Sequence, residues 1–274
     1  MNQVSGGKIN AAARWLDAEH AQRRPFAPLA GAATPESVAQ AYAVQDALVA
    51  LRCATGRGPR AGHKIALTTP AMRAFVGYGD SIAGQVLASA VQRSPATVSA
   101  GAGVHIGFEC ELAFLVDSDT SVDAPPSTRA AIAAHIGGVC AAFELIDDRG
   151  ADYSRFGRDE GATMLSLAAD NAWNHGVVLG DWKTDWQGLD LAALRGVATV
   201  NGVEAGAGHG RDVLGHPLDA MLWIVRHLQT RGQGLRAGEF VTTGSLVTTR
   251  FPQVGERVLF AVDGVGEVRM EIAA

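Results

Sequence analysis

Strict alternation of apolar and polar residues in the middle of the chain predicts a β-strand. Between residues 104 and 116, apolar side chains occupy every second position, at Val104, Ile106, Phe108, Cys110, Leu112 and Phe114. A period of two is typical of a strand that turns one face to a protein core. A second apolar run, residues 139–146, predicts another buried strand that is interrupted by one acid, Glu144.

Helical periodicity dominates the first sixty residues and returns in two later segments. A capping hydroxyl followed by proline, as in Thr34-Pro35 and Thr69-Pro70, is typical of a helix start, and glycine commonly follows a helix end. The expected helices run from about Ala11 to Arg23, from Pro35 to Gly56, from Pro70 to Gly77 and from Pro217 to Gly232.

Short strands and hairpin turns fill the remainder, with turns expected at Asn201-Gly202 and Asp263-Gly264. We therefore predict an α+β fold. A helical N-terminal region, residues 1–60, would precede a β-rich domain, residues 61–274.

Composition excludes several classes of function. Hydrophobic residues make up 47% of the 274 residues and charged residues 19%, which is too apolar for a disordered chain. A net charge of −5 argues against a nucleic-acid partner, and no run approaches the roughly 20 apolar residues of a membrane span. Three cysteines without a Cys-x-x-Cys motif suggest neither a disulfide framework nor a zinc site. We expect a cytoplasmic protein.

The polar face of the first strand carries the candidate chemistry. Glu109 and Glu111 are two positions apart, about 6.5–7 Å along a strand, and point the same way. Two carboxylates on one face repel each other, and burial increases the cost. A divalent cation such as Mg²⁺ or Mn²⁺ between them would relieve both effects. The alternative is an exposed sheet face on which both acids are simply solvated.

Glu144 adds a third carboxylate. A buried glutamate is rare unless it is paired or bound to metal. Its own strand contains no Lys or Arg, and the nearest cation, Arg149, could pair with Asp147 or Asp148 instead. Three glutamates from two strands would form an oxygen site with open positions for water and a chelating substrate.

Several sequence blocks, in this order, resemble the fumarylacetoacetate hydrolase superfamily. They are GHKIALTT (62–69), FECELAFLV (108–116), FELIDDR (143–149), AADNAWNHGVVLG (168–180), NGVEAGAGHGRDVLGHPLDAMLWI (201–224) and LRAGEFVTTGS (235–245). Within that superfamily the chain looks most like the branch of 2-keto-4-pentenoate hydratases, 2-oxohept-3-ene-1,7-dioate hydratases and 4-oxalocrotonate decarboxylases.

This resemblance implies a mixed β-sheet roll preceded by helices, and homo-oligomers are common in the family. It implies that Glu109, Glu111 and Glu144 bind the metal, and that Lys64 lies beside the substrate for proton transfer or carboxylate binding. The loop Thr243-Gly244-Ser245 would receive the carboxylate or oxo group of a small 2-oxo acid.

One further match and one departure concern the substrate. Asp80 is the candidate for an acid that the family places after the Thr-Pro helix, although its surroundings do not align cleanly. Trp173 stands where many relatives have a small hydroxyl residue. His63 and Lys64 would face opposite sides of a strand, and His105 shares the acidic face without a family role.

The leading hypothesis is a Mg²⁺- or Mn²⁺-dependent hydratase of 2-hydroxy-2,4-dienoate acids from aromatic catabolism. The alternatives are decarboxylation of a related 2-oxo diacid and C–C hydrolysis of an acylpyruvate, for which His105 would be the nearby base. A non-catalytic partner subunit is a fourth hypothesis. An intact set of three glutamates favours the enzyme. Lys64 could donate a proton if burial and the adjacent metal lowered its pKa.

Overall fold

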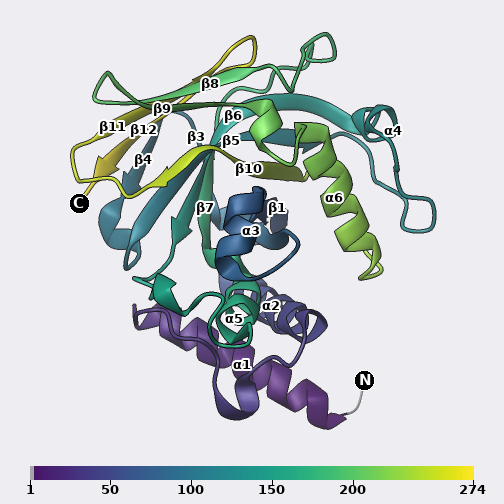
Figure 1. Ribbon diagram of the computed structural model, residues 1–274, viewed down its shortest axis with the longest axis vertical. Coiled ribbons are helices and arrows are strands. Elements are labelled where there is room, and N and C mark those ends of the chain that lie inside the picture. The colour runs from purple at the N-terminus through teal and green to yellow at the C-terminus, as the bar shows by residue number, and fades with distance from the viewer. Residues whose placement is uncertain (1–2) are drawn as a thin grey trace.

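The computed structural model describes residues 3–274 and contains two β-sheets with helices packed around them (Figure 1). The helices are α1 (Gln3–Ala21), α2 (Val38–Arg52), α3 (Pro70–Val76), α4 (Arg129–Ala133), α5 (Ala162–Ala169) and α6 (Pro217–Gln229). The strands are β1 (Arg60–Ala66), β2 (Ile82–Leu87), β3 (Val91–Arg93), β4 (Ala96–Ser99), β5 (Ile106–Val116), β6 (Ile136–Asp147), β7 (Asn174–Leu179), β8 (Arg195–Val200), β9 (Val203–His209), β10 (Phe240–Arg250), β11 (Arg257–Val262) and β12 (Gly266–Ala273).

Both sheets are mixed, which confirms the predicted α+β class. The larger sheet has the order β2-β1-β10-β5-β6-β7-β3, and the smaller one β4-β12-β11-β8-β9. The two long central strands of the larger sheet, β5 and β6, are antiparallel, whereas β1 is parallel to β10.

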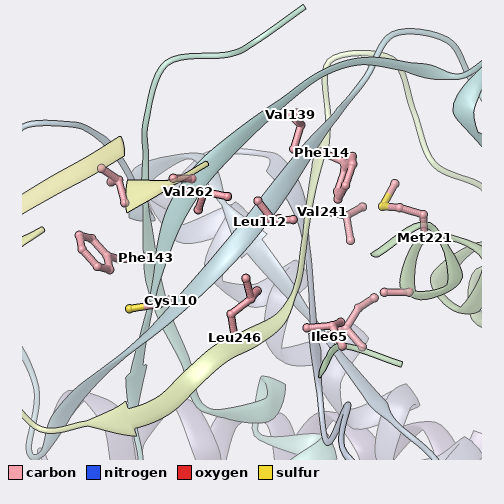
Figure 2. Close-up of a cluster of buried hydrophobic side chains, with 14 of the residues drawn as sticks. Ile65, Cys110, Leu112, Phe114, Val139, Phe143, Met221, Val241, Leu246 and Val262 are labelled. Atoms are coloured by element: carbon pink, nitrogen blue, oxygen red, sulfur yellow. The ribbon is translucent and has the colours of Figure 1, made fainter. Parts of the chain in front are cut away.

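The main hydrophobic core lies between the sheets, and α6 closes it (Figure 2). Alternate residues of β5, among them Leu112 and Phe114, point into this core together with Phe143 of β6. The period of two in residues 104–116 predicts the burial of these β5 residues, but Val104 lies before the strand and is 38% exposed. The intervening residues of β5 and β6 therefore point to the opposite face of the larger sheet.

A second core holds the helices α1, α2 and α5 together beneath the larger sheet in the view of Figure 1. Polar contacts tie this layer to the end of β6. Buried Asp170, which follows α5, accepts from Arg149 Nη2 at 2.6 Å and lies 2.6 Å from His20 Nε2 of α1. Arg149 therefore pairs with Asp170 rather than through its guanidinium with Asp147 or Asp148.

Helix starts and turns agree with the sequence in most places. Thr69 caps α3 and Gly77 ends it in the left-handed region, as expected. The start expected at Thr34-Pro35 is wrong, because α2 begins at Val38 with Ser37 as its cap, while the Thr34 hydroxyl donates to the carbonyl of Leu29.

The β8–β9 hairpin turns through Asn201 and Gly202, whose φ angles are 51° and 82°. Positive φ at both residues suits this pair, as the sequence predicts. Among residues 3–274, no helix combines the length and the apolar character that a membrane crossing requires.

Candidate metal centre

The three predicted glutamates come together on the face of the larger sheet that is turned away from the main core. Glu109 of β5 lies directly opposite Glu144 of β6, and Glu111 is two residues further along β5. One carboxylate oxygen from each glutamate lies within 4.8 Å of the other two. Glu111 and Glu144 are fully buried, so the alternative of a solvated acidic face does not hold for them.

Lys64 of β1 completes this cluster. Its Nζ lies 2.7 Å from Glu144 Oε1, and the lysine is 2% exposed. Two strands, β10 and β5, separate β1 from β6, a distance of about 14 Å in a flat sheet. The curl of the sheet is what allows the two side chains to meet. His63 points to the other side of β1, toward Glu239, as the alternation predicts.

The Thr243-Gly244-Ser245 segment of β10 supports the glutamates through its backbone. The Gly244 N–H donates to Glu111 Oε2 at 2.7 Å. Gly244 has a φ of +111°, and a Cβ there would collide with Thr68, so glycine is required. The Thr243 hydroxyl donates to the Leu112 carbonyl at 3.1 Å, and the Ser245 hydroxyl bonds to the backbone of β5. Both hydroxyls therefore hold β10 against β5.

Two threonines of β10 that the sequence analysis missed also belong to the site. Thr249 donates from its hydroxyl to Glu109 Oε1 in a short hydrogen bond. Thr242 pairs in register with Lys64 on one side and with Ala113 on the other, which places it on the face of the glutamates. Its hydroxyl is buried and has no partner among the described residues. The signal that could have revealed it is a hydroxyl residue directly after Val241 in a buried strand, because the residue after a core position faces the opposite side of the sheet.

Two other candidate residues lie outside the carboxylate cluster. Asp80 is exposed on the loop before β2, where it accepts from the Ser81 N–H and from Trp223 Nε1 at 2.7 and 2.8 Å. None of these contacts joins it to the glutamates. His105 lies further along the same face, with Nδ1 2.7 Å from Asp148 Oδ1.

A strained turn closes the side of the cluster next to Lys64. Asn171, Ala172 and Trp173 have φ angles of 55°, 50° and 58°, a conformation that non-glycine residues rarely adopt. The Asn171 side chain bonds both the N–H and the C=O of Gln85, which fixes the turn against β2. Asn171 therefore has a structural role, and Trp173 packs edge-on to other aromatic rings rather than onto the glutamates.

The electrostatics of the cluster show an excess of negative charge. Burial, the largest effect, raises the pKa of Glu111 well above its usual value, and Glu144 and Glu109 raise it further. Burial also raises the pKa of Glu144 to about 7, although Lys64 opposes this. Burial alone would lower the Lys64 pKa, but Glu144 and Glu109 outweigh it, so the net direction is upward.

These residues fit a divalent cation. Three carboxylates face one lysine, and Glu111 Oε1 is buried without a hydrogen-bond partner among residues 3–274. Such an oxygen is costly in an uncompensated site and is the preferred donor for a hard cation. Glu109, Glu111 and Glu144 would hold the ion, with Lys64 at its edge.

Comparison with known proteins places this arrangement in a family. No model of a protein family matches the sequence. The chain is 30% identical to a 2-hydroxyhexa-2,4-dienoate hydratase of Comamonas testosteroni over 245 residues, which is 89% of both chains. The chain belongs to the hydratase branch of the fumarylacetoacetate hydrolase superfamily.

Two further proteins match this chain over nearly its whole length, one in sequence and one in structure. A 2-keto-4-pentenoate hydratase of Paraburkholderia phymatum is 29% identical over 262 residues, 96% of each chain. The solved structure of a 4-oxalocrotonate decarboxylase from Pseudomonas putida G7, complexed with magnesium and adipate, matches with a TM-score of 0.86, 24% identity and 97% coverage of both chains. The mixed β-roll with its N-terminal helices, expected from the resemblance, is thereby confirmed.

Proposed function

We propose that this protein is a divalent-metal-dependent hydratase that converts 2-hydroxy-2,4-dienoate acids to 4-hydroxy-2-oxo acids by adding water. The observation that carries this proposal is the buried triangle of Glu109, Glu111 and Glu144 with Lys64 against it. Hydratases of such dienoates among the relatives support the reaction, and metal in a structural neighbour supports the cofactor. Oxygen donors alone favour Mg²⁺ or Mn²⁺.

The bound ion would supply Lewis acidity to the carboxylate and oxo oxygens of a 2-oxo acid. Residues of the chain orient the carboxylates that would bind this ion. Gly244 fixes Glu111 through its N–H, and Thr249 fixes Glu109 through its hydroxyl, so both carboxylates are oriented before anything binds. Such orientation removes the entropy that a mobile ligand set would lose on binding.

Lys64 is the group placed to hold or transfer a proton. Its ammonium lies at the edge of the triangle, 2.7 Å from Glu144, and is shielded from water. In the hydratase, Lys64 Nζ would deliver a proton to a carbon of the dienol chain and recover one from the 2-hydroxyl group as this becomes the 2-oxo group. The unpartnered Thr242 hydroxyl on the same face is free to bond the substrate or a water molecule.

The test is turnover of 2-hydroxypenta-2,4-dienoate by protein stripped with chelator and then reloaded. Loss of the dienol absorbance, with 4-hydroxy-2-oxopentanoate as product, should depend on added Mg²⁺ or Mn²⁺. The matched control is Glu144→Gln, which keeps the shape of the side chain. Metal binding without this turnover, but with CO₂ release from 4-oxalocrotonate, would replace the hydratase by a decarboxylase.

A further inference from the structure

The face that carries the glutamates is packed at one end and becomes exposed at the other, toward the start of β5. Below Glu111, the face continues into tightly packed residues, among them Ala113, Cys140 and Ala142, all fully buried. In the other direction, Gly107 pairs with Ile146, two positions from Glu109. Glu109 itself is half-buried, and His105, two residues beyond Gly107, is exposed. The tail of a 2-oxo acid held at the glutamates would therefore extend toward this end of β5.

The ring of Phe251 stands at this point. A Cβ on Gly107 would lie 2.9 Å from Phe251 Cε1 and 3.2 Å from Ile146 Cγ1, so the ring covers the position where a side chain would project. Gly107 is about 7 Å along the strand from Glu109. Thr249, two residues before the ring, bonds Glu109. One short segment thus orients a carboxylate of the site and places an aromatic ring beside it.

A hydrogen-bonded histidine stacks on this ring. His105 stacks on Phe251 with ring centroids 4.0 Å apart and planes within 7°. His105 Nδ1 lies 2.7 Å from Oδ1 of buried Asp148, and the other oxygen of Asp148 accepts from the Tyr153 hydroxyl at 2.7 Å. The imidazole cannot turn without losing its bond to Asp148, so Phe251 is held in place while 39% of it remains exposed.

Charge around the ring disfavours a second carboxylate on the substrate. Asp148, just after β6, is the acid nearest the ring, where it bonds His105, whereas Asp147 lies on the other face and accepts from the N–H groups of Val104 and His105. Two nearby cations are engaged elsewhere: Arg149 Nη2 with Asp170 and Arg250 Nη1 with the carbonyl of Ala205. The other cations of this region, Arg155 and Arg158, lie on the exposed loop beside Asp152. An anionic tail would therefore approach the carboxylate of Asp148 and the apolar ring of Phe251.

We propose that Phe251, seated over Gly107 and braced by His105, is the specificity-determining wall of a tail subsite that selects uncharged, apolar tails over carboxylate tails. The inference rests on the proposed function, because it takes the glutamates as the anchor of the 2-oxo acid end. It goes further by naming the class of tail and the residues that select it.

Calorimetric binding to Mn²⁺-loaded protein tests this without turnover. The probes are pyruvate, 2-oxobutanoate and 2-oxopentanoate, and Mn²⁺ itself is titrated into chelator-stripped protein. A matched pair completes them: 2-oxoglutarate and 5-methyl-2-oxohexanoate, in which an isopropyl group replaces the distal carboxylate. Affinity should rise about threefold for each methylene that reaches the ring. The isopropyl compound should bind at least about tenfold more tightly than 2-oxoglutarate.

Phe251→Ala should reduce the gain per methylene to less than about 1.5-fold, with Mn²⁺ affinity unchanged within about twofold. Val254→Ala is the matched control, because Val254 is 59% exposed on the same segment and should change nothing. Gly107→Ala, which displaces the ring without removing it, should also reduce the gain in affinity per methylene.

Different results would overturn the proposed function and the tail subsite. A wild-type protein that binds neither Mn²⁺ nor pyruvate overturns the proposed function and this inference with it. If Mn²⁺ and pyruvate bind normally, two results would overturn the tail subsite alone. One is that 2-oxoglutarate binds as tightly as its isopropyl counterpart, and the other is that Phe251→Ala leaves the gain in affinity per methylene unchanged.

Discussion

The two faces of β5 and β6 differ in chemistry although they are almost equally buried. Phe143 and Glu144 are neighbours in sequence, and neither is measurably exposed. Phe143 points into the core between the sheets, where removal of apolar surface from water stabilises the fold (Figure 2). Glu144 points to the opposite side, among two more carboxylates and one lysine. Burial alone therefore does not distinguish structure from function, but the partners of the buried groups do.

Among the variants, Glu144→Gln should show the largest difference between its effect on turnover and its effect on stability. Because the amide cannot provide the third negative charge, metal-dependent turnover should fall at least about a thousandfold, while Tm changes by only a few degrees. Dienol absorbance and circular dichroism melts measure the two quantities. Unchanged turnover would refute the metal assignment.

Phe143→Ala should show the reverse pattern. A phenylalanine in this fully buried position costs about 3–5 kcal/mol of unfolding free energy when truncated, through lost transfer energy and a residual cavity. Urea unfolding provides the measurement. At low temperature, where the variant is folded, Mn²⁺ should still bind; loss of Mn²⁺ binding in folded protein would mean that the faces are not independent.

Lys64→Ala refines the comparison within the polar face. Removal of the ammonium takes away the proton carrier but none of the three carboxylates, so turnover should fall about 10²-fold while Mn²⁺ affinity changes less than about fivefold. Turnover and calorimetry on the same preparation separate the two effects. Equal loss in both would place Lys64 in a structural role, and Lys64→Arg tests whether charge alone suffices.

The smallest expected effect is a pH dependence confined to the polar face. The metal binds the ionised carboxylates, and burial raises the pKa of Glu144 to about 7. Protons therefore compete with the metal below pH 7, and affinity should rise with pH through this value, by up to about tenfold per unit for each proton released. Mn²⁺ titrations between pH 5.5 and 8.5 measure this. A flat profile would contradict the proton competition.

The local parts of this architecture could be predicted from sequence. The period of two in β5 identifies both faces of the strand, and thus Glu109 and Glu111, from local chemistry. The Thr69–Gly77 helix is likewise confirmed because its cap and its terminal glycine are adjacent in sequence to the segment that they delimit.

The contacts between distant segments could not be predicted from sequence. Lys64 meets Glu144 only because the sheet curls across two intervening strands, and no pattern in either strand encodes that curvature. Asp80 shows the converse: it is a plausible acid in sequence, but its carboxylate bonds the indole of Trp223, a residue of α6 far along the chain. The Thr243 and Ser245 hydroxyls are predicted to bind substrate, and the structure shows only their hydrogen bonds to the β5 backbone, so that role stays a prediction.

The contact between His20 and Asp170 has a consequence for synthesis of the chain. These residues are 150 positions apart. At translation rates of roughly 5–20 residues per second, α1 is made roughly 8–30 s before Asp170 emerges. Of the elements made in that interval, α2 is the one that α1 contacts most in the fold. The contact of α1 with the end of β6 through Asp170 therefore forms only after residue 170 has been synthesised.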